Sequence, residues 1–332
     1  MRTIELSIDL GSKFITIFQK GIGLVLREPA IAACVRVRDR FEIREAGYRA
    51  ESIITTALGG ARIVAPINEG CVCDEYMCAM LLKHFLKKII PDGIFKPHIK
   101  AMVMIGSSLS NSDRRLVEKC CLKAGIKEVT LVESPLALLA YTGSIGGLFV
   151  DIGGGKTEIC AVTNHGIANG CSVNIAGDAF NGAIIDSIYM NYGVKLGEYT
   201  IENLKKSALS FYINDEGSYV VSGGGREGVP KSLCVTASDM RDAVIPLVDD
   251  IIEVIMSILN QTPPELSAEI LRKGLFISGG STLVPGLIEY IEQALELPVT
   301  PLKDIENAVA IGGAKFFENK NLLSDLLGIK LD

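Results

Sequence analysis

Asp9-Leu10-Gly11-Ser12 ends a run of strand-forming residues, and Asp151-Ile152-Gly153-Gly154-Gly155 and Ser278-Gly279-Gly280-Ser281 do the same farther along the chain. Each of these turns can present backbone N–H groups to a phosphate or a ribose, because glycine lets the backbone approach a ligand closely. Three such turns, far apart in one chain, predict a single nucleotide held between two similar halves.

Asp9 and Asp151 stand in matching places, each at the end of an apolar strand and shortly before a glycine. A lone aspartate there is commonly a turn or cap residue, but two in the same context favour a shared role. Because Mg²⁺ prefers one or two carboxylates with water and phosphate oxygens, we expect both side chains to face a hydrated Mg²⁺.

The composition is that of a globular chain of 332 residues, 48% apolar and 22% charged, which is long enough for two domains. The net charge of −6 gives no general attraction to nucleic acid, so no such partner is expected. No apolar stretch reaches the roughly 18 residues of a spanning helix, and a strand at Ile4 to Leu10 leaves no room for a signal peptide. Nine cysteines, an odd number, suit a reducing compartment, and we expect a cytoplasmic protein.

The apolar periodicity predicts an α/β fold built from a duplicated unit. A strand, a glycine turn and a second strand open the first half at Ile4 to Gln19 and the second half at Leu148 to Thr163. Helices are predicted at about 74–90, from a cap near Ser112 to Gly125, at 178–192 and at 245–259.

Further motifs follow one another in a fixed order along nearly the whole chain. They are Ile8 to Gly11, Leu26 to Ala30, Val150 to Glu158, Ile175 to Asp178, Gly197 to Lys205, Gly228 to Lys231, Thr262 to Leu266 and Ala310 to Gly313. In this order the chain resembles the actin-like ATPases, and within them the bacterial MreB family, whose filaments organise cell-wall synthesis.

The resemblance implies a two-domain actin-like fold with a nucleotide cleft between the domains. Domain I would comprise 1–144 with 314–332 and a small insert subdomain at about 32–65. Domain II would comprise 145–313 with an insert subdomain at about 179–244.

The resemblance also implies roles for individual residues. The phosphates would be wrapped by Gly11, Ser12, Lys13, Gly153, Gly154 and Gly155, and the adenosine side would be contacted by Gly279 and Gly280. Glu202 and Lys205 would reach the ribose or base. From their spacing alone, these two residues share a helix face and form an ion pair.

Three departures from the family cluster around the expected γ-phosphate. Ser134, in Val132-Glu133-Ser134-Pro135, stands where the family has the glutamate that positions the attacking water, and Lys156 replaces a threonine with a related role. Lys13 and Phe14 replace a small residue and an asparagine. Because phosphoryl transfer depends on positioning, losing one oriented contact costs on the order of 10²–10³ in rate. We therefore expect binding to persist and hydrolysis to be slow or absent.

The apolar loop from Ile89 to Pro97 matches the loop that contacts the membrane in the family. Ile94 and Phe95 stand at the places of its inserting pair, and lysines flank them. From the residues alone, a loop folded back on the core remains open.

The expected protein is thus a filament-forming, ATP- or other purine-nucleotide-binding MreB-like protein that uses Mg²⁺. Its expected partners are itself, the inner face of the membrane and shape-determining membrane proteins. The alternatives are a non-filamentous ATPase or kinase of the same superfamily, or a nucleotide-free scaffold in which Lys13, Phe14 and Lys156 fill the phosphate site.

Overall fold

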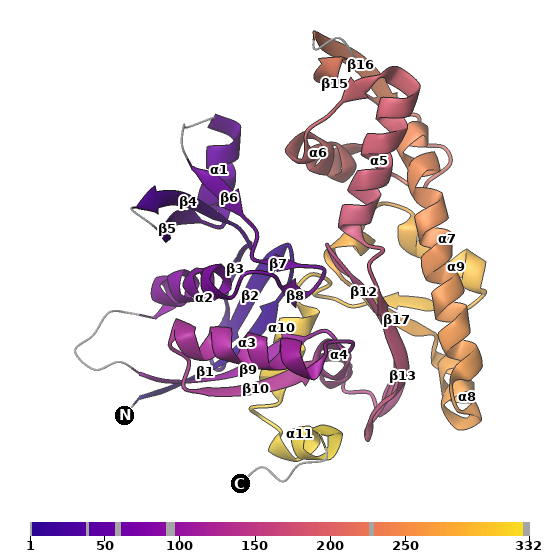
Figure 1. Ribbon diagram of the computed structural model, residues 1–332. Coiled ribbons are helices and arrows are strands. Elements are labelled where there is room, and N and C mark those ends of the chain that lie inside the picture. The colour runs from indigo at the N-terminus through magenta and orange to yellow at the C-terminus, as the bar shows by residue number, and fades with distance from the viewer. Residues whose placement is uncertain (1, 38–39, 57–60, 91–96, 226–228, 328–332) are drawn as a thin grey trace. The chain divides into compact units, whose positions relative to one another are not determined.

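The computed structural model describes residues 2–37, 40–56, 61–90, 97–225 and 229–327. The chain divides into two compact units (Figure 1). The first comprises Met1–Gly146, Val162–Ser172 and Glu306–Asp332, and the second comprises Gly147–Ala161 and Val173–Ile305. Among the described helices, none has the length and apolar character needed to cross a membrane.

A five-stranded sheet with the order β10-β9-β1-β2-β3 organises the first unit. Its strands are β1 (Thr3–Leu10), β2 (Phe14–Gln19), β3 (Gly23–Pro29), β9 (His98–Ile105) and β10 (Glu128–Glu133). β1, β9 and β10 run parallel, whereas β2 and β3 are antiparallel to their neighbours. The carboxyl ends of the parallel strands therefore share one edge of the sheet, which is where α/β proteins commonly bind ligands.

Helices pack on both faces of this sheet. Ile4, Leu6 and Ile8 of β1 share one core with α2 and α3, while Ser7 on the opposite face lies against Gly313 of α10. The helices of this unit are α1 (Tyr48–Thr56), α2 (Glu75–Ile89), α3 (Asn111–Ala124), α4 (Ser134–Thr142), α10 (Ala308–Lys315) and α11 (Lys320–Leu327).

Two small sheets complete the first unit. One has the order β5-β4-β6 and the other pairs β7 with β8. Their strands are β4 (Ala32–Val37), β5 (Arg40–Ala46), β6 (Arg62–Val64), β7 (Ile67–Asn68) and β8 (Cys71–Val72).

A second five-stranded sheet has the order β13-β12-β11-β17-β18. Its strands are β11 (Gly146–Ile152), β12 (Thr157–Thr163), β13 (Gly166–Val173), β17 (Leu275–Ser278) and β18 (Val299–Pro301). β11, β17 and β18 run parallel, so Asp151 and Ser278 lie side by side where β11 and β17 end.

The remaining elements of the second unit are mostly helical. α5 packs against α6 and α7, and a small sheet has the order β14-β15-β16. These elements are α5 (Gly177–Tyr192), β14 (Val194–Lys195), α6 (Glu198–Ala208), β15 (Ser218–Gly225), β16 (Pro230–Thr236), α7 (Ala237–Gln261), α8 (Pro264–Lys273), η1 (Gly280–Leu283) and α9 (Leu287–Leu295).

Two helices begin earlier than the sequence pattern predicts. The cap of α3 is Ser110 rather than Ser112, and α7 begins at Ala237 rather than Ile245. Both helices begin with a capping box, in which the side chains of Ser110 and Asp113, or of Thr236 and Asp239, bond to each other's backbone N–H groups. The apolar spacing that guided the prediction does not register these polar caps.

Candidate functional site

The first glycine turn follows β1 in the first unit. Asp9 is partly buried and lies opposite Thr16 of β2 and Met104 of β9. Gly11 follows in a tight turn, where an added Cβ would lie 2.7 Å from the carbonyl oxygen of Phe14. A larger residue would therefore clash with backbone, which explains glycine at this position.

Neighbouring strands brace the same turn. The hydroxyl of Ser12 accepts a hydrogen bond from the backbone N–H of Gly70 at 2.8 Å. The carbonyl of Lys13 accepts the N–H of Ala30 at 2.8 Å, and the Lys13 side chain is exposed. The Ser12 hydroxyl and the Lys13 carbonyl thus both hold the turn in place.

Ser134 begins α4 at the end of β10. It is 8% exposed, and its hydroxyl donates to the carbonyl of Ile105 at 3.1 Å. Glu133 forms an ion pair with Arg114 of α3 at 2.7 Å. Both side chains therefore have partners within the first unit.

Asp151 lies beside Ser278, whose hydroxyl donates to its carboxylate at 2.7 Å. Burial raises the pKa of Asp151 to about 6; the hydrogen bond from Ser278 opposes the rise, and the buried Glu158 adds to it. Retaining a charge there is costly, which is the environment that a nearby divalent cation relieves.

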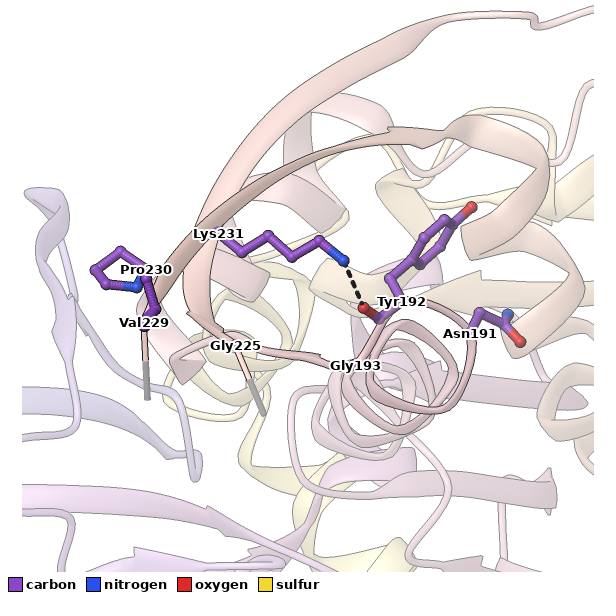
Figure 2. A pocket seen from close by; sticks show the side chains of 7 residues that line it. All are labelled: Asn191, Tyr192, Gly193, Gly225, Val229, Pro230 and Lys231. Atoms are coloured by element: carbon purple, nitrogen blue, oxygen red, sulfur yellow. Dashed lines mark hydrogen bonds between the residues drawn. The ribbon is translucent and has the colours of Figure 1, made fainter. Parts of the chain in front are cut away.

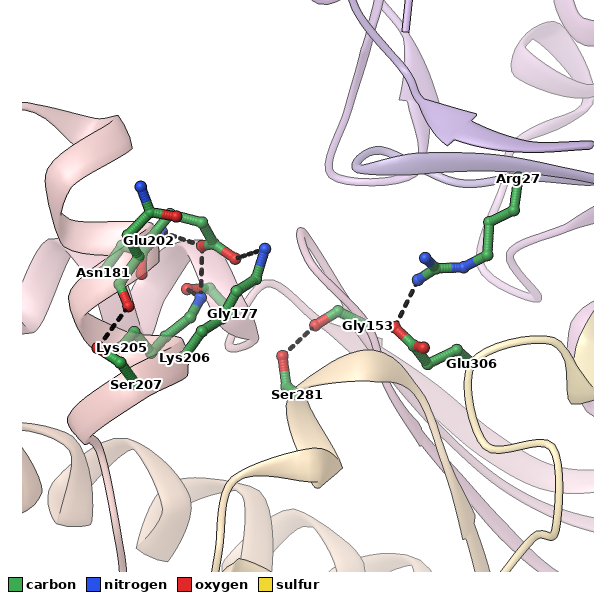
Figure 3. A network of polar contacts seen from close by, with 11 residues as sticks. Arg27, Gly153, Gly177, Asn181, Glu202, Lys205, Lys206, Ser207, Ser281 and Glu306 are labelled. Atoms are coloured by element: carbon green, nitrogen blue, oxygen red, sulfur yellow. Dashed lines mark hydrogen bonds and ion pairs between the residues drawn. The ribbon is translucent and has the colours of Figure 1, made fainter. Parts of the chain in front are cut away.

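The triple glycine after Asp151 is held in place by hydrogen bonds to its carbonyl groups. The hydroxyl of Ser281 donates to the carbonyl of Gly153 at 2.6 Å (Figure 3). The N–H of Asp178 donates to the carbonyl of Gly154 at 2.7 Å. Within the described part of the chain, the backbone hydrogen bonds leave the N–H groups of Gly154 and Gly155 unused.

These donors and carboxylates fit a Mg²⁺-nucleotide. Within the second unit, unused backbone N–H groups at the glycine turn suit phosphate oxygens, and the Asp151 carboxylate suits a hydrated Mg²⁺; within the first unit, Asp9 offers the same kind of carboxylate. Lys156 is partly buried at the end of the same turn and would add a positive charge.

The third turn approaches the second one closely. Gly279 has φ of 97°, and an added Cβ would lie 2.3 Å from the carbonyl oxygen of Ile152. Its N–H donates to the carbonyl of Ile305 at 2.9 Å. Only glycine fits at this position, with Gly280 directly after it at the start of η1.

Glu202 and Lys205 of α6 belong to a polar network (Figure 3). One carboxylate oxygen of Glu202 contacts Lys205 Nζ and Asn181 Nδ2, each at 2.8 Å, and the other contacts Lys206 at 3.1 Å. Lys205 is 8% exposed and also donates to the carbonyl of Gly177 at 3.0 Å.

The network changes the charge state of Glu202. Burial opposes ionisation, but the nearby Lys205 and Lys206 charges, with hydrogen bonds from Lys205 and Asn181, lower its pKa to about 2. Lys205 thereby fastens α6 to the first turn of α5. If Glu202 or Lys205 contacted a ribose or base, that contact would have to share or replace their bonds to Asn181, Lys206 and the Gly177 carbonyl.

Four polar residues of the second unit were missed by the sequence reasoning. They are Asn181, Lys206, Ser278 and Ser281. Ser278 and Ser281 flank the third glycine turn, so the turn itself was a usable signal. Nothing in the local sequence distinguishes Asn181, because its role depends on α6 packing against α5.

A surface hollow of about 450 Å³ lies elsewhere in the second unit (Figure 2). It is lined by the end of α5 and by the β15–β16 hairpin, and Lys231 donates to the carbonyl of Tyr192 at 3.2 Å. None of the predicted nucleotide residues lines this hollow. Ile94 and Phe95, the predicted membrane pair, lie outside the described residues.

The two similar mixed sheets define an actin-like α/β fold. The solved structure of MreB5 of Spiroplasma citri bound to AMPPNP superimposes with a TM-score of 0.88 at 26% identity, covering 98% of this chain and 100% of that one. The MamK double helical filament superimposes with a TM-score of 0.82 at 19% identity, covering 96% of this chain and 99% of that one.

The chain belongs to the MreB/Mbl family, whose model, described as MreB/Mbl protein, matches residues 3–325. It is 31% identical to the cell shape-determining protein MreB of Escherichia coli (strain K12) over 323 residues, which cover 95% of this chain and 93% of the relative. It is 29% identical to the cell shape-determining protein Mbl of Bacillus subtilis (strain 168) over 328 residues, 96% of this chain and 97% of the relative.

Proposed function

We propose that this protein binds ATP or another purine nucleotide with Mg²⁺, assembles into filaments, and hydrolyses the nucleotide slowly or not at all. The observation that carries the proposal is the pair of aspartates, Asp9 and Asp151, at the ends of central strands, each followed by a glycine turn. MreB5 of Spiroplasma citri, at 25–26% identity, binds AMPPNP and ADP in its solved structures.

In this proposal Asp9 and Asp151 would hold a hydrated Mg²⁺, which would supply positive charge to neutralise the phosphates. The phosphates take backbone N–H groups from Gly11 and Ser12, with Lys13 nearby, and from Gly153, Gly154 and Gly155. Gly279 and Gly280 lie along the adenosine side, while Glu202 and Lys205 orient the ribose or base.

Slow turnover follows from Ser134 and Lys156. The Ser134 hydroxyl already donates to the Ile105 carbonyl, and Glu133 is paired with Arg114, so no carboxylate is left at that place to orient a water. Enzymes accelerate phosphoryl transfer mainly by positioning the reacting groups. Losing the residues that position the water would therefore slow hydrolysis while leaving nucleotide binding intact.

Assembly and location complete the proposal. The proposal includes the two domains that the resemblance implies, each with its insert subdomain. We place the protein in the cytoplasm, with filaments at the inner face of the membrane through Ile94 and Phe95, beside shape-determining membrane proteins. The net charge of −6 disfavours nucleic acid as a partner.

The test measures three quantities on one preparation: affinity for Mg²⁺-AMPPNP, phosphate release from ATP, and polymer seen by electron microscopy with and without ATP. We expect binding and polymer with little phosphate release. Rapid release without polymer would identify a non-filamentous ATPase. Polymer with no nucleotide binding would identify a scaffold, and either result would reject the proposal.

A further inference from the structure

Arg27 of β3 makes two contacts in the first unit that the proposed function does not use. Its guanidinium carbon lies 3.9 Å from the centre of the Phe14 ring. Its Nη2 donates to the Glu306 carboxylate at 2.5 Å (Figure 3). We call these three residues the Arg27 cluster.

The first contact braces the phosphate turn. Phe14 directly follows Lys13, the last residue of that turn, and begins β2. Arg27 lies opposite Thr16 on the neighbouring strand, which brings the guanidinium over the Phe14 ring. A cation over an aromatic face is attractive, so Arg27 restrains the residue from which the turn departs.

The second contact reaches the segment that comes from the third glycine turn. Glu306 is bonded directly to Ile305, whose carbonyl accepts the N–H of Gly279 at 2.9 Å. Each step of this path lies within one unit, and the Ile305–Glu306 peptide bond joins the units. The ion pair within the first unit therefore restrains Glu306, the residue directly after the Ile305 carbonyl that the Gly279 N–H contacts in the second unit.

Glu306 is the main polar restraint on Arg27. The arginine side chain is only 20% exposed and its Nε is buried without a hydrogen-bond partner in the described part of the chain. Removing the carboxylate would leave a partly buried cation unpaired, which costs more than losing a solvated surface pair.

We infer that Arg27 is a positioning residue: through Phe14 it restrains the phosphate turn of the first unit, and through its ion pair with Glu306 it restrains the residue bonded to Ile305, so that its loss weakens nucleotide binding. The inference rests on the proposed nucleotide binding. Arg27 does not contact the nucleotide in this account, so its loss affects di- and triphosphates alike.

The test compares Glu306→Gln, Arg27→Met and the double variant with wild-type protein, using Mg²⁺-AMPPNP and Mg²⁺-ADP as ligands. Each single change should raise both dissociation constants by the same factor, roughly three- to tenfold, the size expected for an ion pair and a cation–π contact. The double variant should bind about as weakly as the weaker single variant, because both changes break one link.

Glu5→Gln is the matched control. It removes the Lys20–Glu5 ion pair, 2.8 Å long and on the same sheet, without touching either turn. Both variants should remain folded in thermal unfolding without nucleotide, with Glu306→Gln destabilised more than Glu5→Gln, while only Glu306→Gln weakens binding.

Other outcomes overturn the inference in distinguishable ways. If the wild-type protein binds nucleotide and the Arg27 and Glu306 variants bind it equally well, the positioning role alone is rejected. The same holds if Glu5→Gln loses as much affinity as Glu306→Gln. A loss confined to AMPPNP would mean that Arg27 touches the γ-phosphate, which also rejects it. Wild-type protein that binds neither nucleotide rejects the positioning role and the proposed function together.

Discussion

Among single residues, Asp151 lowers the stability of the folded protein when its carboxyl group is ionised. Its pKa is raised from 3.8 to about 6 by burial, so the folded protein holds this proton more tightly than the unfolded chain does. Stability therefore falls as the pH rises from about 4 to about 6, and the penalty is constant above that range. A nearby positive charge would lower this pKa again, as the proposed Mg²⁺ site requires.

Asp151→Asn should consequently have two opposite effects. At pH 8 the nucleotide-free protein should gain about 1–3 kcal/mol of unfolding free energy, because a neutral amide needs no charge in this place. Binding of Mg²⁺-AMPPNP should weaken by at least about tenfold, or 1.4 kcal/mol. Urea unfolding and calorimetric titration measure the two effects. Asp250→Asn, an exposed change on α7, should alter neither, and lower stability of Asp151→Asn would mean that the carboxylate is structural.

Ser134 and Lys156 permit a gain-of-function prediction. Ser134→Glu with Lys156→Thr should raise phosphate release more than either change alone, since both introduced groups would position the same water in the proposed mechanism. A rise on the order of 10² is expected for restoring an oriented contact. Single-turnover phosphate release measures it, and Mg²⁺-AMPPNP affinity provides the control. Intact affinity with no gain in rate would show that Ser134 and Lys156 do not limit hydrolysis.

Among the secondary-structure elements, α6 is held against α5 by the ion pairs and hydrogen bonds of Glu202 and Lys205. Glu202 has its pKa lowered to about 2, so its contribution to stability is present above about pH 4.5 and is lost as the pH falls toward 2. Because Lys205 binds the Gly177 carbonyl as well, the same network fixes the start of α5 beside the triple glycine.

Glu202→Gln should lower the unfolding free energy at pH 7 by about 1–3 kcal/mol and flatten its dependence on pH between about 4.5 and 2. Denaturant unfolding across that range, without nucleotide, measures both effects. Glu253→Gln, at an exposed site on α7, should change stability by no more than about 0.5 kcal/mol. Parallel pH profiles for wild type and Glu202→Gln would show that the network contributes no net stability.

The same elements show why the sequence predicted much of the fold and less of the candidate site. The glycine turns were predictable because strand ends, glycine and aspartate occur together locally. The start of α7 was placed too late because the prediction did not use the capping box at Thr236, although Met240 and Val244 are also buried at helical spacing. The partners of Glu202 were missed because Asn181 comes from another helix, which only tertiary packing brings near. The roles of the predicted site residues remain predictions.

For the protein as a whole, the proposed membrane contact depends on whether one subunit or a filament binds. Burying Ile94 and Phe95 in lipid is worth about 1.5–3 kcal/mol each, which holds a single subunit only marginally. Many copies on one polymer bind together, and avidity can multiply the effect by roughly 10²–10⁴. Membrane binding should therefore depend on assembly.

The membrane prediction is tested with an Ile94→Ser, Phe95→Ser double variant in liposome co-sedimentation. Polymerised wild-type protein should sediment with the vesicles, and polymerised variant should not, because serine removes the apolar surface while leaving the flanking lysines. Electron microscopy must show polymer in both samples, so that lost sedimentation reports lipid contact and not lost assembly. Wild-type protein kept below its polymerisation threshold should bind weakly, like the variant. Equal sedimentation of the two polymers would mean that the loop packs on the protein, because lysine attraction alone would then account for the binding.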